Sequence, residues 1–294
     1  MSITTPAPAG AEVFTEPQMS TPRLRRVGVV PAVLGSVWLV IAVFPILYVL
    51  FSSLRTTDSF LSAAPWSIPT HPTLDSYKRV LDAHIGLYFV NSVVVTTLSV
   101  ALILVVSVLA AYVIVRVRSR TASMVFTAIL FGLAIPLQAT IIPLYVLIAK
   151  MGIYDTLLAL ILPYAAFGIP ITMLILVTFM RDIPSSLFEA MELEGASHMQ
   201  TLRKLVVPLT RPALVTVAIY NAIQIWNGFL FPLILTQSQN TRALPLALWN
   251  FKGEYSIDVP AIMAAVTLST LPLVLAYVVG RRQLISGLTA GFGK

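Results

Sequence analysis

The sequence contains no cysteine and very little charge. Of its 294 residues, 57% are hydrophobic and only 11% are charged, whereas an average soluble domain carries about 25% charged residues. The absence of cysteine excludes disulfides, thiolate nucleophiles and cysteine-ligated metal sites. The shortage of charge predicts that a lipid bilayer, and not water, surrounds much of the chain.

The uncharged residues are gathered into long blocks. Six blocks contain no Asp, Glu, Lys or Arg, and each exceeds the ~20 residues that an α-helix needs to cross the hydrocarbon core of a bilayer. We therefore predict an all-α membrane protein with six transmembrane helices, near residues 28–54, 87–115, 122–149, 156–180, 212–236 and 259–280.

The positive charges predict how these helices are oriented. An even number of spans places both termini on one side of the membrane, and 13 of the 19 Lys and Arg residues lie on that side. The positive-inside rule makes it the cytoplasm. Residues 1–26, rich in Ala, Pro, Ser and Thr, are expected to form a disordered cytoplasmic tail. The net charge of +7 does not indicate nucleic acid, because the cations sit at helix ends.

Further absences narrow the function. No predicted span contains an ionisable residue, which weakens the case for a carrier driven by protons or sodium, although backbone carbonyls can also bind sodium. There is no GxxxxGK[ST] phosphate loop, so this chain is not expected to bind ATP in that way. The three histidines are scattered outside the spans and predict no metal site. We expect neither an enzyme nor a bound cofactor.

A translocation route through such a chain must be lined by neutral polar groups. Amides form uncharged hydrogen bonds and an indole offers a flat apolar face with one donor, which suits an uncharged hydroxylated solute. The alternative is that these side chains tie helices together. Asn221, Gln224 and Asn227 are each three residues apart, so one face of a helix would present all three amides. The candidates are Asn91, Gln138, Asn221, Gln224, Trp226 and Asn227.

Proline interrupts most spans, notably where Pro136 and Pro143 flank "LQATII". A proline removes one helix hydrogen bond and can bend the helix. We expect a distorted stretch here, either a flexible pathway wall or ordinary kinked packing.

The stretch "EAMELEGAS", residues 189–197, places three carboxylates within the cytoplasmic coupling loop, residues 181–212. We predict a helix from about Pro184 to Glu194 that ends at Gly195 in a left-handed conformation. Ser197 then caps a second helix that ends before Pro208. A helix lying on a membrane would carry Lys and Arg on its polar face. This acidic helix better suits a basic groove on another protein, with a solvated loop helix as the alternative.

The coupling loop resembles the EAA loop of permease subunits of binding-protein-dependent ABC importers. Glu189, Ala190 and Gly195 match the pattern E-A-A-x-x-x-G, while Met191 replaces the second alanine and Glu194 the usual aspartate. Gly228 departs from the acidic residue that often follows Trp-Asn. Other stretches, over about 27–294, resemble the carbohydrate branch and its maltose-type six-span permease: "NSVVVTTLS" (91–99), "AAYVIVRVR" (110–118), "DTLLALILPYAAFGIP" (155–170), "WNGFLFPLIL" (226–235) and "RRQLISGLTAGFGK" (281–294).

The resemblance implies a type I ABC importer permease fold in a prokaryotic cell (inner) membrane. Residues 27–86 would form the first span and an external loop, 87–281 the core permease domain and 282–294 a cytoplasmic tail. The helix of the EAA loop would dock in a cleft of a cytoplasmic ATPase, through Glu189, Ala190, Glu192, Glu194, Gly195 and Ser197. The tail, with Gly287 and Gly291, would reach into the ATPase dimer, unless it is simply a frayed chain end.

The implied partners are a second homologous permease, two ATPase subunits that bind ATP and Mg, and an external solute-binding protein or lipoprotein. The implied function is import of a sugar or oligosaccharide, with half of the pathway formed by this chain. The same importer for another solute, such as a polyamine or a glycerol phosphate, remains an alternative. So does an ion-coupled secondary carrier, while an intramembrane enzyme is a distant third.

Overall fold

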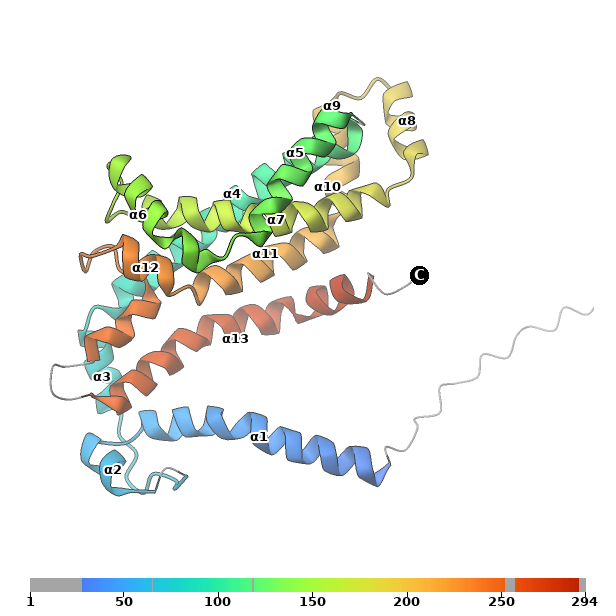
Figure 1. Ribbon diagram of the computed structural model, residues 1–294. Helices are drawn as coiled ribbons and strands as arrows, with labels where there is room; N and C mark the ends of the chain where they lie inside the picture. Colours follow the sequence, from blue (N-terminus) through green and yellow to red (C-terminus); the bar gives the residue numbers. More distant parts are fainter. Residues whose placement is uncertain (1–27, 65, 118, 252–256, 291–294) are drawn as a thin grey trace, which may run out of the picture. The chain divides into compact units, whose positions relative to one another are not determined.

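A computed structural model describes residues 28–64, 66–117, 119–251 and 257–290. Within these ranges the regular structure is helical and contains no β-strand (Figure 1). The chain divides at Pro45 into two compact units, residues 1–45 and 46–294. The division falls inside α1 (Val29–Ser53), which is as apolar as its block in the sequence predicts, with a mean hydropathy of 2.5.

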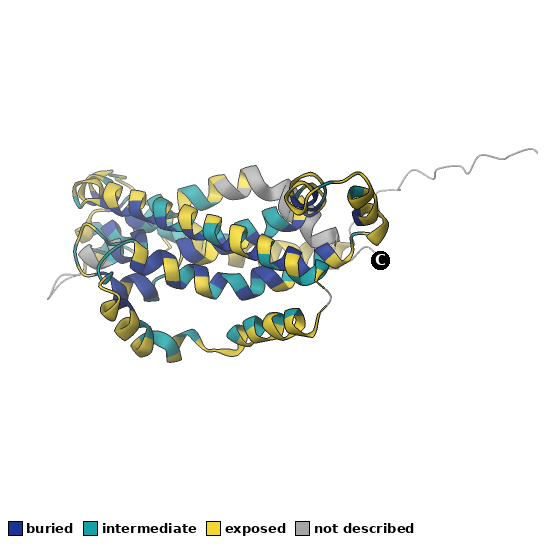
Figure 2. Cartoon of the chain, turned by 90° about the horizontal axis from the view of Figure 1, so that it is seen from above, coloured by how far each residue is buried: buried dark blue, intermediate teal, exposed yellow. Residues whose placement is uncertain are grey.

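Three long helices form the core of the second unit. In Figure 1, α7 (Leu158–Arg181) runs along α4 (Ile85–Arg116), and α11 (Arg211–Trp226) contacts both of them. Small residues allow this close approach, as in other transmembrane bundles. A Cβ at Gly168 would collide with Ile103 of α4 and lie 2.7 Å from Asn221 Oδ1 of α11. The buried residues accordingly concentrate on the facing sides of these helices (Figure 2).

The third predicted span is broken, as the proline pair indicates. Residues 122–149 comprise α5 (Arg120–Phe131), the 3₁₀ turns η1 (Gly132–Ala134) and η2 (Leu137–Thr140), and α6 (Ile141–Lys150). The two halves are bent by 96°. Ile135 is extended (ψ 116°), the conformation favoured before a proline, and Pro136 has no N–H to continue the ladder.

The fifth predicted span is also not one straight helix. Residues 212–236 divide into α11 and α12 (Leu230–Leu235), with the break at 227–229. Gly228 lies in this break, and Pro232 in the first turn of α12 has no N–H to bond back to the carbonyl of residue 228. The expected continuous helix over 212–236 is therefore wrong. The last span lies in α13 (Val259–Ala290), which packs on α11.

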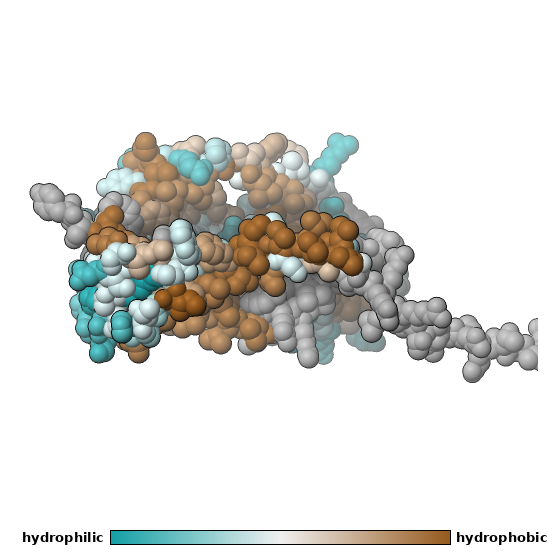
Figure 3. Space-filling view, turned by 90° about the horizontal axis from the view of Figure 1, so that it is seen from below, coloured by the Kyte–Doolittle hydropathy of each residue, from teal (hydrophilic) through white to brown (hydrophobic). Residues whose placement is uncertain are grey.

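The expected number of six spans is met only in part. Within the described ranges, three helices are long and apolar enough to cross a membrane alone, and each of two bent pairs could add one more. In α13 the apolar part that the structure describes in full, Val259–Leu275, has 17 residues. Figure 3 shows largely hydrophobic side chains over the visible helices, with hydrophilic ones gathered toward one end.

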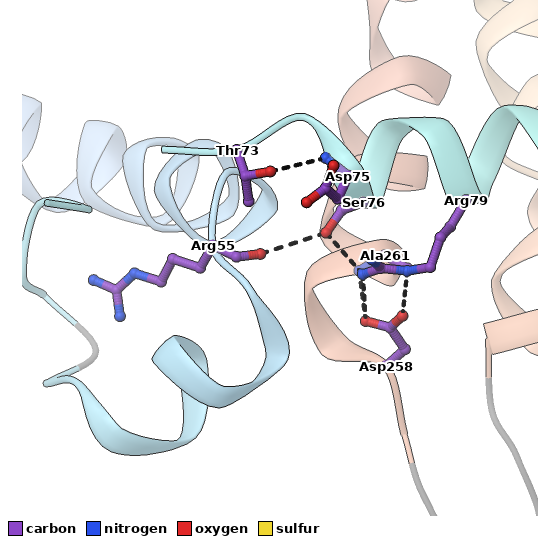
Figure 4. A network of polar contacts seen from close by, with 7 residues as sticks. All are labelled: Arg55, Thr73, Asp75, Ser76, Arg79, Asp258 and Ala261. Carbon is purple, nitrogen blue, oxygen red and sulfur yellow. Dashed lines mark hydrogen bonds and ion pairs between the residues drawn. The ribbon is translucent and has the colours of Figure 1, made fainter. Parts of the chain in front are cut away.

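The segment 55–86, which the sequence predicts to be an external loop, contains two helices among its described residues. These are α2 (Thr57–Ser62) and α3 (Asp75–Asp82). Arg79 of α3 binds both carboxylate oxygens of Asp258 through Nε (2.9 Å) and Nη2 (3.4 Å), and Asp258 in turn accepts from Ala261 N at the start of α13 (Figure 4). These contacts join the segment to the last helix, beside the 3₁₀ segment η4 (Leu244–Phe251).

Candidate functional site

The coupling loop forms two helices joined by a glycine, close to the prediction. The first is α8 (Ser185–Leu193), and Gly195 follows with a φ of +73°. Hydrogen bonds from Gly195 N to Glu192 O (3.0 Å) and from Ala196 N to Met191 O (2.9 Å) close its end. This left-handed residue satisfies carbonyls that the helix leaves open. Gly195 therefore sets the direction in which the chain leaves α8.

Ser197 caps the second helix with a complete capping box. Gln200 N donates to Ser197 Oγ (3.3 Å), and Ser197 N donates to Gln200 Oε1 (2.8 Å). These reciprocal bonds satisfy two open N–H groups at the start of α9 (His198–Thr201).

Two predicted boundaries of the coupling loop are wrong. Pro184 lies before α8 in an extended conformation and not within its first turn. The second helix does not end before Pro208, because α9 continues through a π-helical turn (Leu202–Val206) into α10 (Val207–Leu209). A wide turn reduces the clash between a proline ring and the preceding carbonyls. The chain bends by 76° only at Thr210, where α11 follows.

The three carboxylates of the loop have different surroundings. Arg116, at the end of α4, donates from Nη2 to Glu192 Oε1, and its guanidinium lies 4.8 Å from the centre of the Phe188 ring. Glu192 is thus bound within this chain, although about half of its side chain stays exposed. Glu189 and Glu194 are exposed.

The buried side of α8 is attached to the membrane helices. Phe188 packs in a cluster with Ala111 and Tyr112 of α4 and Met180 of α7. Tyr112 Oη also lies 3.3 Å from His198 Nδ1 at the start of α9. The exposed side presents Ala190 and Leu193, which is 90% exposed, besides the two free carboxylates. Such a helix has a fixed inner face and an outer face available to a partner.

A cavity of about 870 Å³ adjoins the root of α8. Its walls come from the ends of α4 and α7, the start of α5 and the first residues of α8. Arg116, Arg181 and Glu189 line it, so it is polar and carries both signs of charge.

Three of the predicted pathway residues form buried tertiary hydrogen bonds: Asn221 and Trp226 join two helices, and Asn91 joins α4 to a loop. Asn91 Nδ2 donates to the carbonyls of Asn240 (2.8 Å) and Arg242 (3.0 Å). Asn221 Nδ2 donates to Thr172 Oγ1 (2.9 Å) and Val217 O (2.8 Å). Trp226 Nε1 donates to Ser269 O (3.1 Å). All three are buried, and their contacts are those of the helix-tying alternative.

The other predicted pathway residues are exposed but do not share one face. Gln138 lies in the broken third span, and Gln224 lies on α11. Asn227 is the residue after α11, with its amide turned back to Ile223 O (2.8 Å). Gln224 and Asn221 line one cavity, of about 370 Å³, whereas Asn227 lines another, of about 280 Å³, with Trp226. The expected common face of Asn221, Gln224 and Asn227 is therefore divided, because α11 ends at Trp226.

The predicted tail residues fall at the margin of the structure. Gly287 is in α13, and Gly291 lies outside the described residues.

Asp155, which no pattern in the sequence singled out, fastens the loop at residues 237–241. Asp155 has a φ of +57°, and its carboxylate accepts from the N–H groups of Gln237 (2.8 Å) and Ser238 (3.0 Å) and from the hydroxyl of Thr241. Burial alone would raise the pKa of Asp155, but these hydrogen bonds outweigh it and lower the pKa to about 2. Its partners lie some 80 residues away, so no local pattern reveals it.

Sequence analysis also missed Tyr164, although it stands in the quoted stretch 155–170. Its hydroxyl is buried and has no hydrogen-bond partner among the residues that the structure describes. It lies against Gly228, in the break between α11 and α12.

The sequence and the fold both match known membrane proteins. A family model described as binding-protein-dependent transport system inner membrane component matches residues 103–288. The ABC transporter permease protein ORF2 of Caldicellulosiruptor sp. is 43% identical over 87% of this chain and 93% of that protein. The diacetylchitobiose uptake system permease protein of Streptomyces coelicolor is 33% identical over 91% of this chain and 89% of that protein.

Among solved structures, a chain of a bacterial ABC transporter that imports the acidic polysaccharide alginate has a TM-score of 0.77. It covers 87% of this chain and 95% of its own length at 24% sequence identity. The fold is therefore shared with an importer of known architecture.

Proposed function

Because the chain belongs to the family of inner membrane components of binding-protein-dependent transport systems, we propose that it is a permease subunit of an ATP-driven importer of a sugar or oligosaccharide. The names of its relatives support a carbohydrate, among them the diacetylchitobiose permease. The proposed assembly contains a second homologous permease, two ATPase subunits that hold ATP and Mg, and an external solute-binding protein. In it, this chain has six spans and both termini in the cytoplasm of a prokaryotic cell.

The observation that carries the proposal is the construction of α8. Its inner face is anchored by Phe188 and by the bond between Arg116 and Glu192, while Glu189 on its outer face remains exposed. A helix fastened on one side only can transmit the movement of a partner bound on the other side. We expect an ATPase to grip α8 around Glu189 and Glu194 and to move the ends of α4 and α7.

The proposed route of the solute passes the exposed amide of Gln224. A polar side chain within the membrane is costly in contact with lipid, so Gln224, near the end of α11, has to face a partner subunit or a water-filled path. Asn221 is a positioning residue in this arrangement, because it binds Thr172 in the wall. The break at 227–229 and the bent third span supply irregular backbone, which membranes tolerate where it is buried in protein or lines a cavity.

The function is tested by uptake in the native host. Deletion of the gene is expected to abolish accumulation of one sugar, and a plasmid copy to restore it. An ATPase is expected to copurify with the tagged permease. Uptake should stop when ATP is depleted and continue when an ionophore collapses the ion gradients. Uptake that survives ATP depletion but stops with the ionophore would instead indicate an ion-coupled carrier. If deletion abolishes uptake of only a polyamine or a glycerol phosphate, the importer carries that solute and not a sugar.

The route is tested by cysteine scanning, which needs no prior removal of native cysteines. A cysteine at 224 should react with a small water-soluble thiol reagent, and its labelling should change when ATP and binding protein are added. Val217→Cys, at a position that is 1% exposed, is the matched control and should stay unlabelled. An inert cysteine at 224 in a variant that still transports would move the route elsewhere.

A further inference from the structure

The cavity of about 370 Å³ beside α11, here called the α7–α11 pocket, is uncharged throughout. Its volume falls in the range of about 300–1,000 Å³ that is usual for small-molecule sites. It contains no Asp, Glu, Lys, Arg or His in its lining. The walls are formed by Leu137, Tyr164, Phe167, Gly168, Ile171, Tyr220, Asn221, Gln224, Ile225, Gly228, Phe229, Leu230 and Phe231.

Aromatic rings and amides share this lining in a way that suits a sugar ring. Tyr164 and Phe167 lie 5.0 and 5.7 Å from Phe231 between ring centres, and Gln224 offers a neutral donor and acceptor. Ring faces can cover the C–H side of a sugar, while amides bind its hydroxyls. A carboxylate or sulfonate would enter without a cation to pair with it, which is unfavourable in an apolar site.

Tyr164 packs closely against Gly228 in the pocket. A Cβ built at Gly228 would lie 2.7 Å from Tyr164 Cζ and 2.9 Å from Cε1, and still nearer to Oη. Glycine at 228 thus makes room for the tyrosine hydroxyl. That hydroxyl is nevertheless buried and forms no hydrogen bond with any residue of the described ranges. A hydroxyl left in this way destabilises the conformation that buries it.

We propose that the α7–α11 pocket binds an uncharged sugar ring and that the Tyr164 hydroxyl is one of its hydrogen-bonding groups. This inference rests on the proposed function as a sugar permease. The segment that covers the hydroxyl is the non-helical break at 227–229. When the break moves away from α7, the hydroxyl exchanges an apolar contact for a hydrogen bond to the solute.

The first arm of the test determines the class of solute. Cells with and without the gene are given labelled maltose, trehalose and diacetylchitobiose as neutral probes, and an alginate oligosaccharide as the acidic probe. If deletion of the gene abolishes uptake of a neutral sugar and not of the acidic probe, the result supports a neutral sugar as the ligand of the pocket. Loss of the acidic probe overturns the neutral class but leaves sugar import in place. If uptake of no sugar depends on the gene, the proposed function itself fails.

The second arm examines Tyr164→Phe in the full complex, reconstituted in vesicles with its binding protein. The half-saturating sugar concentration is governed by the binding protein, so the readout is the amount of sugar carried per ATP hydrolysed. Loss of one neutral hydrogen bond corresponds to about a 3- to 10-fold effect, and we expect this ratio to fall by about that factor. The matched control is Tyr145→Phe on α6, outside the pocket, which should leave the ratio unchanged.

Thermal unfolding separates this role from packing. Tyr164→Phe keeps the ring and removes only an unpartnered hydroxyl, so the unfolding temperature should equal or exceed that of the wild type. Reduced sugar per ATP at unchanged or higher stability supports the proposal. An unchanged ratio, or a loss of transport that is matched by a lower unfolding temperature, overturns the role of Tyr164.

Discussion

Arg116, the last residue of α4, binds Glu192 on α8 and lies over the ring of Phe188. One side chain therefore joins a membrane-crossing helix to both an acidic and an aromatic residue of the coupling loop. The contact is partly solvated, with 28% of the Arg116 side chain and 56% of the Glu192 side chain exposed. Its contribution to stability is accordingly small, about 1 kcal/mol or less. In the importer that we propose, its role is to transmit movement from α8 to α4.

Replacement of Arg116 should uncouple the importer more than it destabilises it. For Arg116→Gln we expect ATP hydrolysis to continue, uptake to fall about tenfold, and the unfolding temperature to change little. Arg116→Glu combined with Glu192→Arg should restore part of the uptake. Arg120→Gln, at an exposed position nearby, is the control. If Arg116→Gln and Arg120→Gln reduce uptake equally, the contact between Arg116 and Glu192 has no specific role in coupling.

Glu189 should be half of a charge pair with the ATPase. Truncation of one partner of a desolvated pair typically costs ~2–5 kcal/mol. Glu189→Lys is therefore expected to abolish uptake and to reduce the ATPase that copurifies, while the amount of permease in the membrane is unchanged. Asp58→Lys, on α2 and far along the chain from α8, serves as the control. Normal uptake by the Glu189→Lys variant would exclude Glu189 from the interface.

Gly195 should tolerate asparagine but not valine. Nothing lies within 4 Å of a Cβ added there, so the only obstacle is the φ of +73°. A left-handed conformation costs an ordinary L-residue about 1–2 kcal/mol, and asparagine adopts it most readily. Gly195→Val should uncouple ATP hydrolysis from uptake, whereas Gly195→Asn should retain most of the ATP-driven uptake. Uptake at the wild-type rate by the valine variant would show that the bend after α8 is dispensable.

Asp155 should stabilise the loop at residues 237–241 in a pH-dependent way. Its pKa is lowered from 3.8 to about 2 in the folded state, so the folded state favours the ionised form. The stabilisation is complete above pH 3.8 and is lost as the pH falls toward 2. Asp155→Asn should lower the free energy of unfolding by about 1–2 kcal/mol at pH 7, allowing for partial solvent exposure.

Thermal unfolding of the purified complex at a series of pH values checks this prediction. The difference between wild type and Asp155→Asn should be constant from pH 7 to about pH 5 and shrink only below pH 4. Asp58→Asn, whose carboxylate is exposed on α2, is the control. A difference that already changes between pH 7 and 5 would assign the effect to another group.

Local chemistry predicted the coupling loop because each of its signals acts over a few residues. Gly195 supplies the left-handed turn, and Ser197 with Gln200 closes a cap three residues long. The proline pair likewise predicted the break at Pro136. The end of α10 could not be predicted from Pro208, since the π turn before it has no sequence signature of its own.

The contacts of the pocket and of the external loop could not be predicted, because they join distant parts of the chain. Tyr164 contacts Gly228, which lies 64 positions further along the chain (228 − 164). Asn91 binds the carbonyl of Asn240, which lies 149 positions further along. A helical face drawn from spacing alone grouped Asn227 with Asn221, and the end of α11 at Trp226 separates them.

The pairing of Arg79 with Asp258 also sets an order of assembly. The two residues stand 179 positions apart, and ribosomes add about 5–20 residues per second. The interval between synthesis of Arg79 and synthesis of Asp258 is therefore roughly 9 to 36 s. During that interval α3 is made but has no ion pair to the start of α13. A chain that is truncated before residue 258 therefore lacks the ion pair that joins α3 to the start of α13.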